Sequence, residues 1–318
     1  MKNSKNNFEE LIQLCDMNSI KFLEDQRLSE YTNTRTGGKV PLMVFPKEDD
    51  ELRNVMKLIA EQHLKYYVLG EMTNIVASSK RMDIVIVNLI EFNDSVQFDE
   101  NSRVLTVGAG CKMKSLSKWA AVHSITGLQW MEGIPGTVGA GAYMNAGFLA
   151  GEDFSSTLIS ARVLMPDLSY KQVTNEQLQY SYRKSSLQST GGIVTSVQLL
   201  VRMGKPWKIK LRMWRYHTRR AKHQPLDLPS AGTVFVPPMP YHVGGILPQM
   251  GLTGYTIGGA QISKKSPGFI VGVDHMTGED YYQLVQFIQQ SVFEKYHVRL
   301  RPEVRLIGFK DDVDANKK

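Results

Sequence analysis

The feature that most constrains the fold is an alternation of short β-rich runs with longer segments whose apolar residues recur at helical spacing. The β-rich runs are Tyr66–Gly70, Ile84–Leu89, Val104–Val107 and Val304–Gly308. The helical segments are Asp49–Leu64, Lys112–His123, Trp207–Arg220 and Asp280–His297. Because such alternation is typical of strands packed against helices, the sequence predicts an α/β or α+β architecture. A chain of 318 residues is long enough for two or three domains.

Composition narrows the class of protein. Apolar residues make up 42% of the chain and charged residues 22%, which is typical of a globular rather than a disordered protein. No apolar run reaches the roughly 18 residues of a membrane-spanning helix, and the N-terminus lacks the apolar core of a secretory signal. Cys15 and Cys111 have no metal or redox spacing, and the histidines show no ligand motif. We therefore expect a cytoplasmic protein without a membrane span or a metal site.

The positive charge is concentrated in one segment. The net charge is +7, and the residues from Lys205 to His223 alone carry eight Lys and Arg and no acid. One interpretation is a surface for an anionic partner, such as nucleic acid or a diphosphate. The other is a solvated helix face beside Trp207, Ile209, Met213 and Trp214. The second is favoured, and a nucleic-acid partner is not expected, because no recognisable nucleic-acid-binding module accompanies the basic segment.

The change to a basic composition also suggests where the chain divides. We place the main domain boundary near residue 204. On this division, residues 1–30 are an N-terminal extension, and residues 31–204 form a first region with subdomains of about 31–90 and 91–204. Residues 205–310 form a C-terminal domain, and residues 311–318 are a charged tail.

Two loops have the composition of an anion-binding site. The segment Ile134–Gly147 is rich in glycine, which lets backbone N–H groups approach phosphate oxygens closely. The segment Leu69–Asn74 follows a predicted strand and offers hydroxyl and amide groups to an anion. Neither has the GxGxxG pattern of a Rossmann dinucleotide site. Taken singly, each is as consistent with a turn or a close packing contact as with a phosphate cradle.

Together, these loops belong to a series of motifs that runs along nearly the whole chain, from about Thr32 to Gly308. The motifs are TRTGG at Thr34–Gly38, the strand and loop that end at Asn74, IPGTVG followed by YMNAG at Ile134–Gly147, SYRKS at Ser181–Ser185, PSAGTVF at Pro229–Phe235, GYTIGGAQIS at Gly254–Ser263 and PEVRLIG at Pro302–Gly308. In this order and spacing, they resemble the UDP-N-acetylmuramate dehydrogenase family, also called UDP-N-acetylenolpyruvoylglucosamine reductase or MurB. The segments IPGTVG…YMNAG and PEVRLIG are the most specific.

This resemblance implies a fold and a reaction. The fold is α+β, with two FAD-binding α/β subdomains of the vanillyl-alcohol-oxidase (PCMH) type within residues 31–204 and a C-terminal substrate-binding α+β domain. The reaction reduces UDP-N-acetylglucosamine enolpyruvate to UDP-N-acetylmuramate for peptidoglycan synthesis in the bacterial cell wall. The implied cofactor is FAD, with NADPH as the hydride donor, and the implied ligand is a UDP-sugar. The oligomeric state is left open.

The resemblance also assigns roles to individual residues. Hydride addition builds negative charge on the enolpyruvyl carboxylate, so cationic or protonated donors are needed around it. Arg183 would bind this carboxylate, a protonated or hydrogen-bonded Glu303 would stabilise the same charge, and Thr233 takes the position of the proton donor. Without the motifs, Arg183 is interpreted as a surface ion pair and Glu303 as a charge at a strand end. The residues assigned to FAD are Gly70, Thr73, Asn74, Ile134, Pro135, Gly136, Thr137, Gly139 and Asn145.

Several positions depart from the family pattern. Thr233 replaces a serine, and its extra methyl group restricts the side chain where geometry matters. Glu71 and Met72 stand where glycine or small polar residues are usual, and a carboxylate is unfavourable beside a pyrophosphate. Val236 and Pro237 replace a polar or basic pair, and a lysine is missing from the Gly244–Leu247 segment. These departures leave open a second interpretation, a divergent FAD-binding paralogue with impaired or lost activity.

Overall fold

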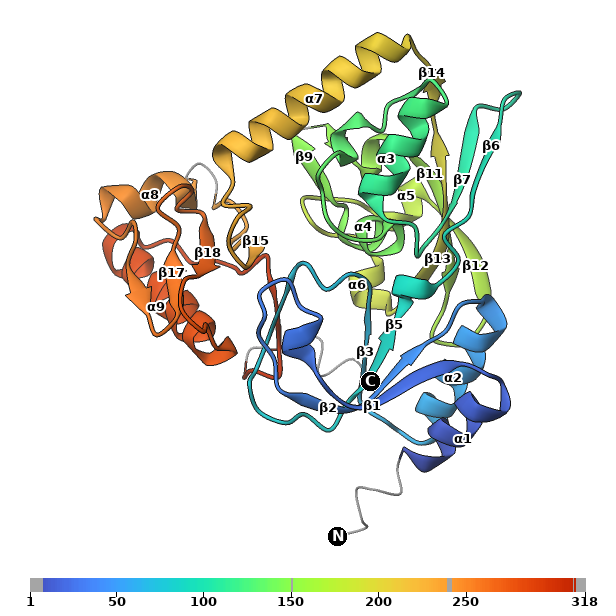
Figure 1. Cartoon of the computed structure of the whole chain (residues 1–318), viewed down its shortest axis with the longest axis horizontal. Coiled ribbons are helices and arrows are strands. Elements are labelled where there is room, and N and C mark those ends of the chain that lie inside the picture. The colour runs from blue at the N-terminus through green and yellow to red at the C-terminus, as the bar shows by residue number, and fades with distance from the viewer. Residues whose placement is uncertain (1–7, 150, 239–241, 311, 313–318) are drawn as a thin grey trace. The chain divides into compact units, whose positions relative to one another are not determined.

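The computed structural model describes residues 8–149, 151–238, 242–310 and 312 (Figure 1). The chain divides into two compact units and passes between them several times. Unit 1 consists of Met1–Glu24, Leu42–Glu71 and Ile84–Arg219. Unit 2 consists of Asp25–Pro41, Met72–Asp83 and Arg220–Lys318. These units differ from the division predicted near residue 204, because the basic helix begins in unit 1 and two short N-terminal segments belong to unit 2. The assignment of FAD and substrate to separate domains stays a prediction.

The first sheet of the chain has the strand order β1-β2-β5-β3, in which β2, β5 and β3 run parallel. Two helices contribute to its hydrophobic cluster, where Leu11 and Cys15 of the first helix lie with Leu52 of the second. Residues 9–17 are therefore part of a core, although the sequence predicted an extension over residues 1–30. The elements are α1 (Glu9–Met17), α2 (Asp49–Glu61), β1 (Lys21–Arg27), β2 (Lys39–Phe45), β3 (Tyr66–Leu69) and β5 (Val85–Asn88).

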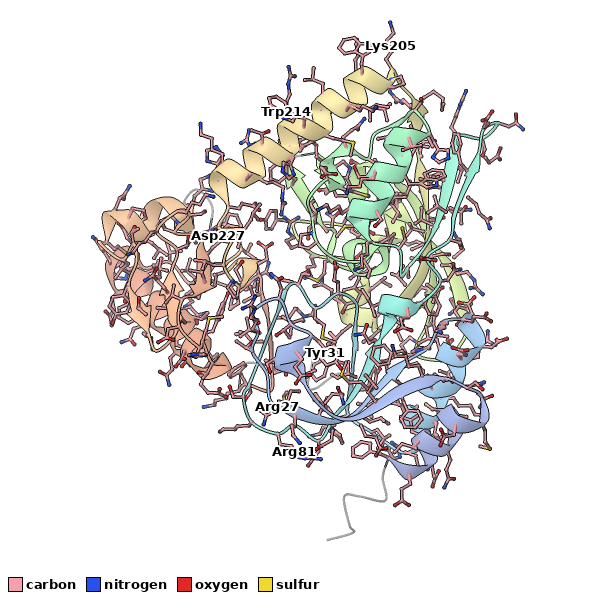
Figure 2. All side chains as sticks on the ribbon, in the orientation of Figure 1. Arg27, Tyr31, Arg81, Lys205, Trp214 and Asp227 are labelled. Carbon is pink, nitrogen blue, oxygen red and sulfur yellow. The ribbon has the colours of Figure 1, made fainter. Side chains whose placement is uncertain are left out.

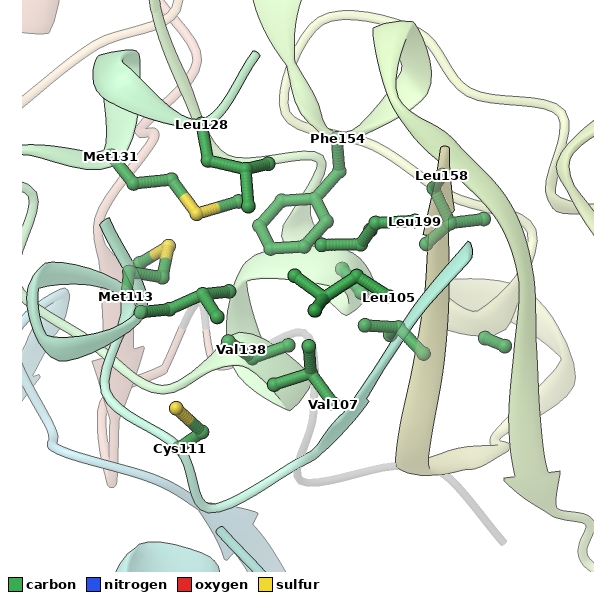
Figure 3. Close-up of a cluster of buried hydrophobic side chains, with 14 of the residues drawn as sticks. Leu105, Val107, Cys111, Met113, Leu128, Met131, Val138, Phe154, Leu158 and Leu199 are labelled. Carbon is green, nitrogen blue, oxygen red and sulfur yellow. The ribbon is translucent and has the colours of Figure 1, made fainter. Parts of the chain in front are cut away.

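A second sheet in unit 1 is antiparallel, with the order β12-β11-β13-β7-β6. Its core contains Leu105 and Val107 from β7, with Met113 and Leu116 from α3 and Phe154 packed into the same cluster (Figure 3). The elements are β6 (Val96–Asp99), β7 (Val104–Gly108), β11 (Leu158–Leu164), β12 (Tyr170–Thr174), β13 (Ile193–Leu200), α3 (Met113–Val122), α4 (Val138–Met144), α5 (Asn175–Leu178) and α6 (Leu187–Thr190).

Short pairings and the long basic helix complete unit 1. Strand β14 pairs with β8, β10 pairs with β9, and the basic helix α7 follows β14. The elements are β8 (Ile125–Thr126), β9 (Gly147–Leu149), β10 (Glu152–Asp153), β14 (Arg202–Met203) and α7 (Pro206–His223), with 3-10 helices η1 (Leu28–Glu30) in unit 2 and η2 (Leu89–Glu91), η3 (Gln129–Met131) and η4 (Phe154–Ser156) in unit 1.

Unit 2 is built on an antiparallel sheet of order β15-β18-β17-β16 and a parallel pair, β19 and β4. Helix α9 begins at a reciprocal cap, in which the Asp280 N–H donates to the Thr277 hydroxyl and the Thr277 N–H to the Asp280 carboxylate. Its buried face, which includes Tyr281, joins the core of this unit. The elements are β4 (Ile75–Ala77), β15 (Ser230–Thr233), β16 (Thr256–Ile257), β17 (Ala260–Ile262), β18 (Phe269–Gly272), β19 (Arg305–Ile307), α8 (Val243–Gln249) and α9 (Gly278–Tyr296).

The TRTGG motif has a structural role in unit 2. The buried hydroxyl of Thr34 hydrogen-bonds to that of Thr36 at 2.8 Å and donates to the Ile75 carbonyl at 3.0 Å. A Cβ at Gly38 would lie 2.1 Å from the Lys80 carbonyl oxygen, so a larger residue would push the two segments apart. The motif therefore fastens the start of β2 to β4.

The segments predicted as helices and strands all contain such elements, which differ from the predicted bounds by a few residues. The predicted packing of α7 is wrong in part. Ile209 is buried, but Trp207 and Trp214 are more than 60% exposed and do not share its face. Among the described helices, none has the length and hydropathy to cross a bilayer. The predicted tail, residues 311–318, lies outside the described residues except for residue 312.

Both cysteines are buried and unpaired. Burial raises the pKa of the Cys15 thiol to about 12 and that of the Cys111 thiol to about 11. Because the reactive species is the thiolate, both side chains are protonated and inert at neutral pH. Neither therefore takes part in the chemistry discussed below.

Candidate functional site

The glycine-rich loop at residues 134–137 is held by its neighbours and leads into α4. The Met113 N–H donates to the Gly136 carbonyl at 3.0 Å, and the Val138 N–H donates to the Cys111 carbonyl at 2.8 Å. The Thr137 hydroxyl accepts from the Ala140 N–H at 3.4 Å, as an N-terminal helix cap does. Gly136 has a φ of +119°, which glycine adopts without strain. These contacts fix the direction of the Gly136 N–H.

The carboxylate of Glu71 contacts this loop. The Gly136 N–H donates to the Glu71 carboxylate at 2.6 Å, and Lys112 Nζ lies 3.1 Å from the other carboxylate oxygen. The preceding residue contacts the same loop, because a Cβ at Gly70 would lie 2.6 Å from the Thr137 hydroxyl oxygen. Gly70 and Glu71, the part of the predicted strand-loop that belongs to unit 1, therefore lie beside the glycine loop. The Gly136 N–H and the Lys112 ammonium suit a phosphate oxygen as well as a carboxylate.

Glu71 takes a role that its sequence position alone did not indicate. The sequence predicts that its charge would oppose a pyrophosphate, and in the structure its carboxylate accepts the hydrogen bond of the Gly136 N–H. Lys112 was missed by sequence reasoning, because its position before a helix has no binding signature. A backbone bridge between Lys112 and Thr137 brings it to the loop. Only the folded chain shows this pairing.

Gly139, predicted to bind the cofactor, allows close packing in the structure. Its N–H donates to the Ala109 carbonyl at 2.9 Å, and an added Cβ would lie 2.7 Å from that of Ala109. Ile134 is 8% exposed and belongs to the hydrophobic core of the second sheet, whereas Pro135 is exposed. Thr73 is half-buried in a turn. A contact of these residues with a cofactor stays a prediction.

Arg183 lies in a tight turn between α5 and α6. The Ser181 and Lys184 backbones pair across this turn at 3.0 and 3.1 Å, and Arg183 has a φ of +54°. Its guanidinium donates to the Gly147 carbonyl at 2.8 Å and to the Asn145 carbonyl at 3.3 Å. These two backbone oxygens orient the guanidinium.

Asn145 connects this turn to the helix end. Its amide donates to the Ser181 carbonyl at 3.0 Å, and its amide oxygen accepts from the Ser155 N–H at 3.0 Å. The side chain is buried, and its left-handed φ of +47° ends α4. Two residues assigned separately from the sequence, Asn145 and Arg183, therefore form one structure in unit 1.

Thr233, Glu303 and Asn74 come together in unit 2. The Glu303 N–H donates at 2.7 Å to the carbonyl of Val234, the residue after Thr233. The Asn74 amide donates to the Glu303 carbonyl at 3.1 Å, and the Arg305 N–H donates to the Asn74 carbonyl at 2.9 Å. Backbone hydrogen bonds and the Asn74 side-chain amide thus join three sequence-distant motifs. Arg183 belongs to unit 1, so a joint role with Thr233 and Glu303 stays a prediction.

Comparison with known proteins identifies the family. Residues 40–170 match the model of an FAD binding domain, and residues 224–307 match the C-terminal domain of UDP-N-acetylenolpyruvoylglucosamine reductase. The reductase of Limosilactobacillus reuteri is 37% identical over 92% of this chain and 97% of its own length. The chain belongs to the UDP-N-acetylenolpyruvoylglucosamine reductase family. The reductase of Lactiplantibacillus plantarum is 36% identical over 93% of this chain and 96% of its own.

A solved structure supports the same assignment. The crystal structure of MurB from Thermus caldophilus matches 91% of this chain and 98% of its own, with a TM-score of 0.75 and 27% identity. The resemblance on which the sequence analysis relied is confirmed, as is the fold class that it implied. The two family models match different parts of the chain, residues 40–170 and residues 224–307.

The structural role of Asn145 predicts the effect of its replacement. Asn145→Ala leaves the Ser155 N–H and the Ser181 carbonyl without this partner and places alanine in the left-handed region. We expect the free energy of unfolding to fall by about 2–4 kcal/mol, measured by guanidinium chloride denaturation. Asn145→Gly loses the same hydrogen bonds without the backbone penalty, so its loss should be about 1 kcal/mol smaller. Equal losses in the two variants would contradict the role of the backbone conformation.

Proposed function

We propose that this chain catalyses the NADPH-dependent reduction of UDP-N-acetylglucosamine enolpyruvate to UDP-N-acetylmuramate in peptidoglycan synthesis. The observation that carries the proposal is the match, along more than nine-tenths of the chain, to proteins named UDP-N-acetylenolpyruvoylglucosamine reductase. The match gives no support to the second interpretation, a paralogue without this activity. We further propose that the protein acts in the cytoplasm, where NADPH is available and the buried cysteines stay reduced.

The donor set of the glycine loop fits the diphosphate of FAD. The Gly136 N–H and the Lys112 ammonium together bind one anionic group in the structure, and a diphosphate oxygen has the same requirements. The assignment of Thr73, Asn74 and the other residues of the family motifs to FAD binding is part of the same proposal. When bound, FAD would supply the hydride-transfer chemistry between NADPH and the enolpyruvyl group.

The side chains of the chain itself would handle charge and protons. We propose that Arg183 binds the enolpyruvyl carboxylate, because its guanidinium is oriented by the carbonyls of Asn145 and Gly147. The Glu303 carboxyl would stabilise the charge that develops there, and the Thr233 hydroxyl would deliver the proton. Both residues are held by the same backbone connection through Val234. The Thr233 hydroxyl would carry the proton to be transferred, and its methyl group would restrict the geometry.

An anaerobic titration tests the proposed function. The purified protein is expected to bind FAD and turn yellow, to lose the flavin absorbance when NADPH is added, and to regain it on addition of UDP-N-acetylglucosamine enolpyruvate. Loss of absorbance without recovery would favour the paralogue that lacks this activity. A protein that FAD cannot reconstitute would overturn both flavin-based interpretations.

The proposed role of Glu303 predicts a selective defect. Glu303→Gln removes the ionisable carboxyl but preserves its size, so recovery of absorbance with substrate should slow by more than about tenfold. Bleaching by NADPH should change by less than about twofold, because that half-reaction does not involve the enolpyruvyl charge. Stopped-flow absorbance measures both rates. Glu294→Gln, an exposed change on α9, is the matched control. Equal slowing of the two half-reactions would remove Glu303 from this role.

The position of Glu71 predicts an effect on FAD affinity. Because its carboxylate accepts from the Gly136 N–H and pairs with Lys112, it competes with a phosphate for the same donors. Glu71→Gln removes this charge, and we expect the dissociation constant of FAD to fall by about tenfold, measured by quenching of flavin fluorescence. Glu61→Gln, an exposed change on α2, should leave it unchanged. Weaker binding in Glu71→Gln would show that the carboxylate organises the site.

A further inference from the structure

Helix α7 presents apolar side chains on two opposite faces. Ile209 and Tyr216 are 2% and 7% exposed and pack into unit 1. At about 100° per residue, Trp207, Leu211 and Trp214 lie within an arc of roughly 60° on the other side of the helix. Their exposed fractions are 61%, 38% and 62%. We call these three residues the outer stripe; Figure 2 shows the side chains of α7 and labels Trp214.

Cations flank the outer stripe on both sides. The same helical geometry places Lys208 and Arg215 along one edge and Lys210 along the other. All three are exposed, and α7 contains no acidic residue. Arg212, farther round the helix, pairs with the Glu152 carboxylate at 2.6 Å, which also accepts from the Tyr216 hydroxyl. The inner face thus fastens the helix to unit 1, and the outer face keeps its positive charge toward solvent.

A groove adjoins the outer stripe and offers a place for a phosphate. Its volume is about 710 Å³, and it lies entirely within unit 1. Its α7 side includes Trp207, Leu211, Lys208 and Arg215, and Thr126 and Gln129 contribute polar groups. Apolar and cationic side chains therefore line one surface. A phospholipid headgroup, with its phosphate beside glycerol and acyl carbons, combines the complementary chemistry.

We propose that α7 docks on an anionic phospholipid bilayer. The indoles of Trp207 and Trp214 enter the membrane interface with Leu211 between them, and the flanking cations reach lipid phosphates beside the groove. Indole rings favour the boundary between hydrocarbon and water, and long cationic side chains extend from an apolar face to polar headgroups. The helix would lie in the plane of the surface, because the stripe runs along its axis.

The composition of the stripe favours a bilayer over single-stranded nucleic acid. Nucleic-acid sites of this kind also combine aromatic side chains with cations, and they stack bases on the rings. Leu211, placed between the two tryptophans, offers no stacking surface but gains from transfer into an apolar interface. The proposal goes beyond the reductase activity and does not depend on it.

Vesicle sedimentation with the full chain tests this proposal. The protein should bind vesicles of phosphatidylcholine with phosphatidylglycerol at least about tenfold more tightly than pure phosphatidylcholine vesicles, and added salt should weaken the binding. The double variant Trp207→Ser/Trp214→Ser should reduce the affinity by about tenfold or more. Lys208→Glu/Arg215→Glu should do the same and remove most of the salt dependence. All four side chains are exposed, so the circular dichroism spectrum should stay unchanged.

Matched variants separate this site from general surface effects. Lys114→Glu/Lys118→Glu makes the same charge change on exposed positions of α3, and Met17→Ser/Val122→Ser removes exposed apolar side chains elsewhere in unit 1. Both should change the affinity by less than about twofold. Equal binding to neutral and anionic vesicles, or unchanged binding of the α7 variants, would overturn the proposal. Tighter binding to a single-stranded oligonucleotide than to anionic vesicles would also overturn it. The same holds if the protein does not bind vesicles but forms a dimer that Trp207→Ser/Trp214→Ser abolishes.

Discussion

The direct packing of Gly139 against Ala109 is the constraint on which the glycine-rich loop depends. With no side chain between them, the start of α4 approaches the end of β7 closely enough for a hydrogen bond from the Gly139 N–H to the Ala109 carbonyl. This contact places the preceding residues, and with them the Gly136 N–H, at a fixed point beside Lys112. An ordinary side chain at position 139 would move the loop. Glycine at position 139 therefore fixes the distance between two backbone segments as well as the direction of a donor.

The Glu71 carboxylate has two consequences for the glycine-rich loop. It pairs with Lys112 and accepts from the Gly136 N–H, so both donors are satisfied within unit 1 and the loop keeps its shape. In the proposed complex with FAD, a phosphate would have to displace this carboxylate, which would reduce the net gain from binding. The residue that the sequence identified as unfavourable would then be a compromise between a stable loop and a tight site.

The sequence predicted the helices and strands well, because periodicity reports which face of an element is buried. It predicted the reaction through motifs. However, it assigned Asn145 and Asn74 to FAD and Arg183 and Glu303 to catalysis, so it did not predict the hydrogen bonds that join Arg183 to Asn145 and Asn74 to Glu303. The sequence could not predict the Glu71–Lys112 pair, because a contact between two loops leaves no local pattern in the sequence. The faces of α7 were also misjudged. Its apolar residues lie on two faces of the helix, and only the exposed fractions show that Trp207 and Trp214 lie outside the core.

Neither unit is a continuous stretch of chain, and this has a consequence for synthesis on the ribosome. Unit 1 has all its residues once Arg219 has been made, whereas unit 2 needs residues 220–318 to receive segments made long before. Strand β4 can pair with β19, and Asn74 can bond to Glu303, only after the last residues have been synthesised. The nascent chain therefore carries residues 25–41 and 72–83 without their partners in residues 220–318 for most of translation, and unit 2, which holds Thr233 and Glu303, is the last to become native.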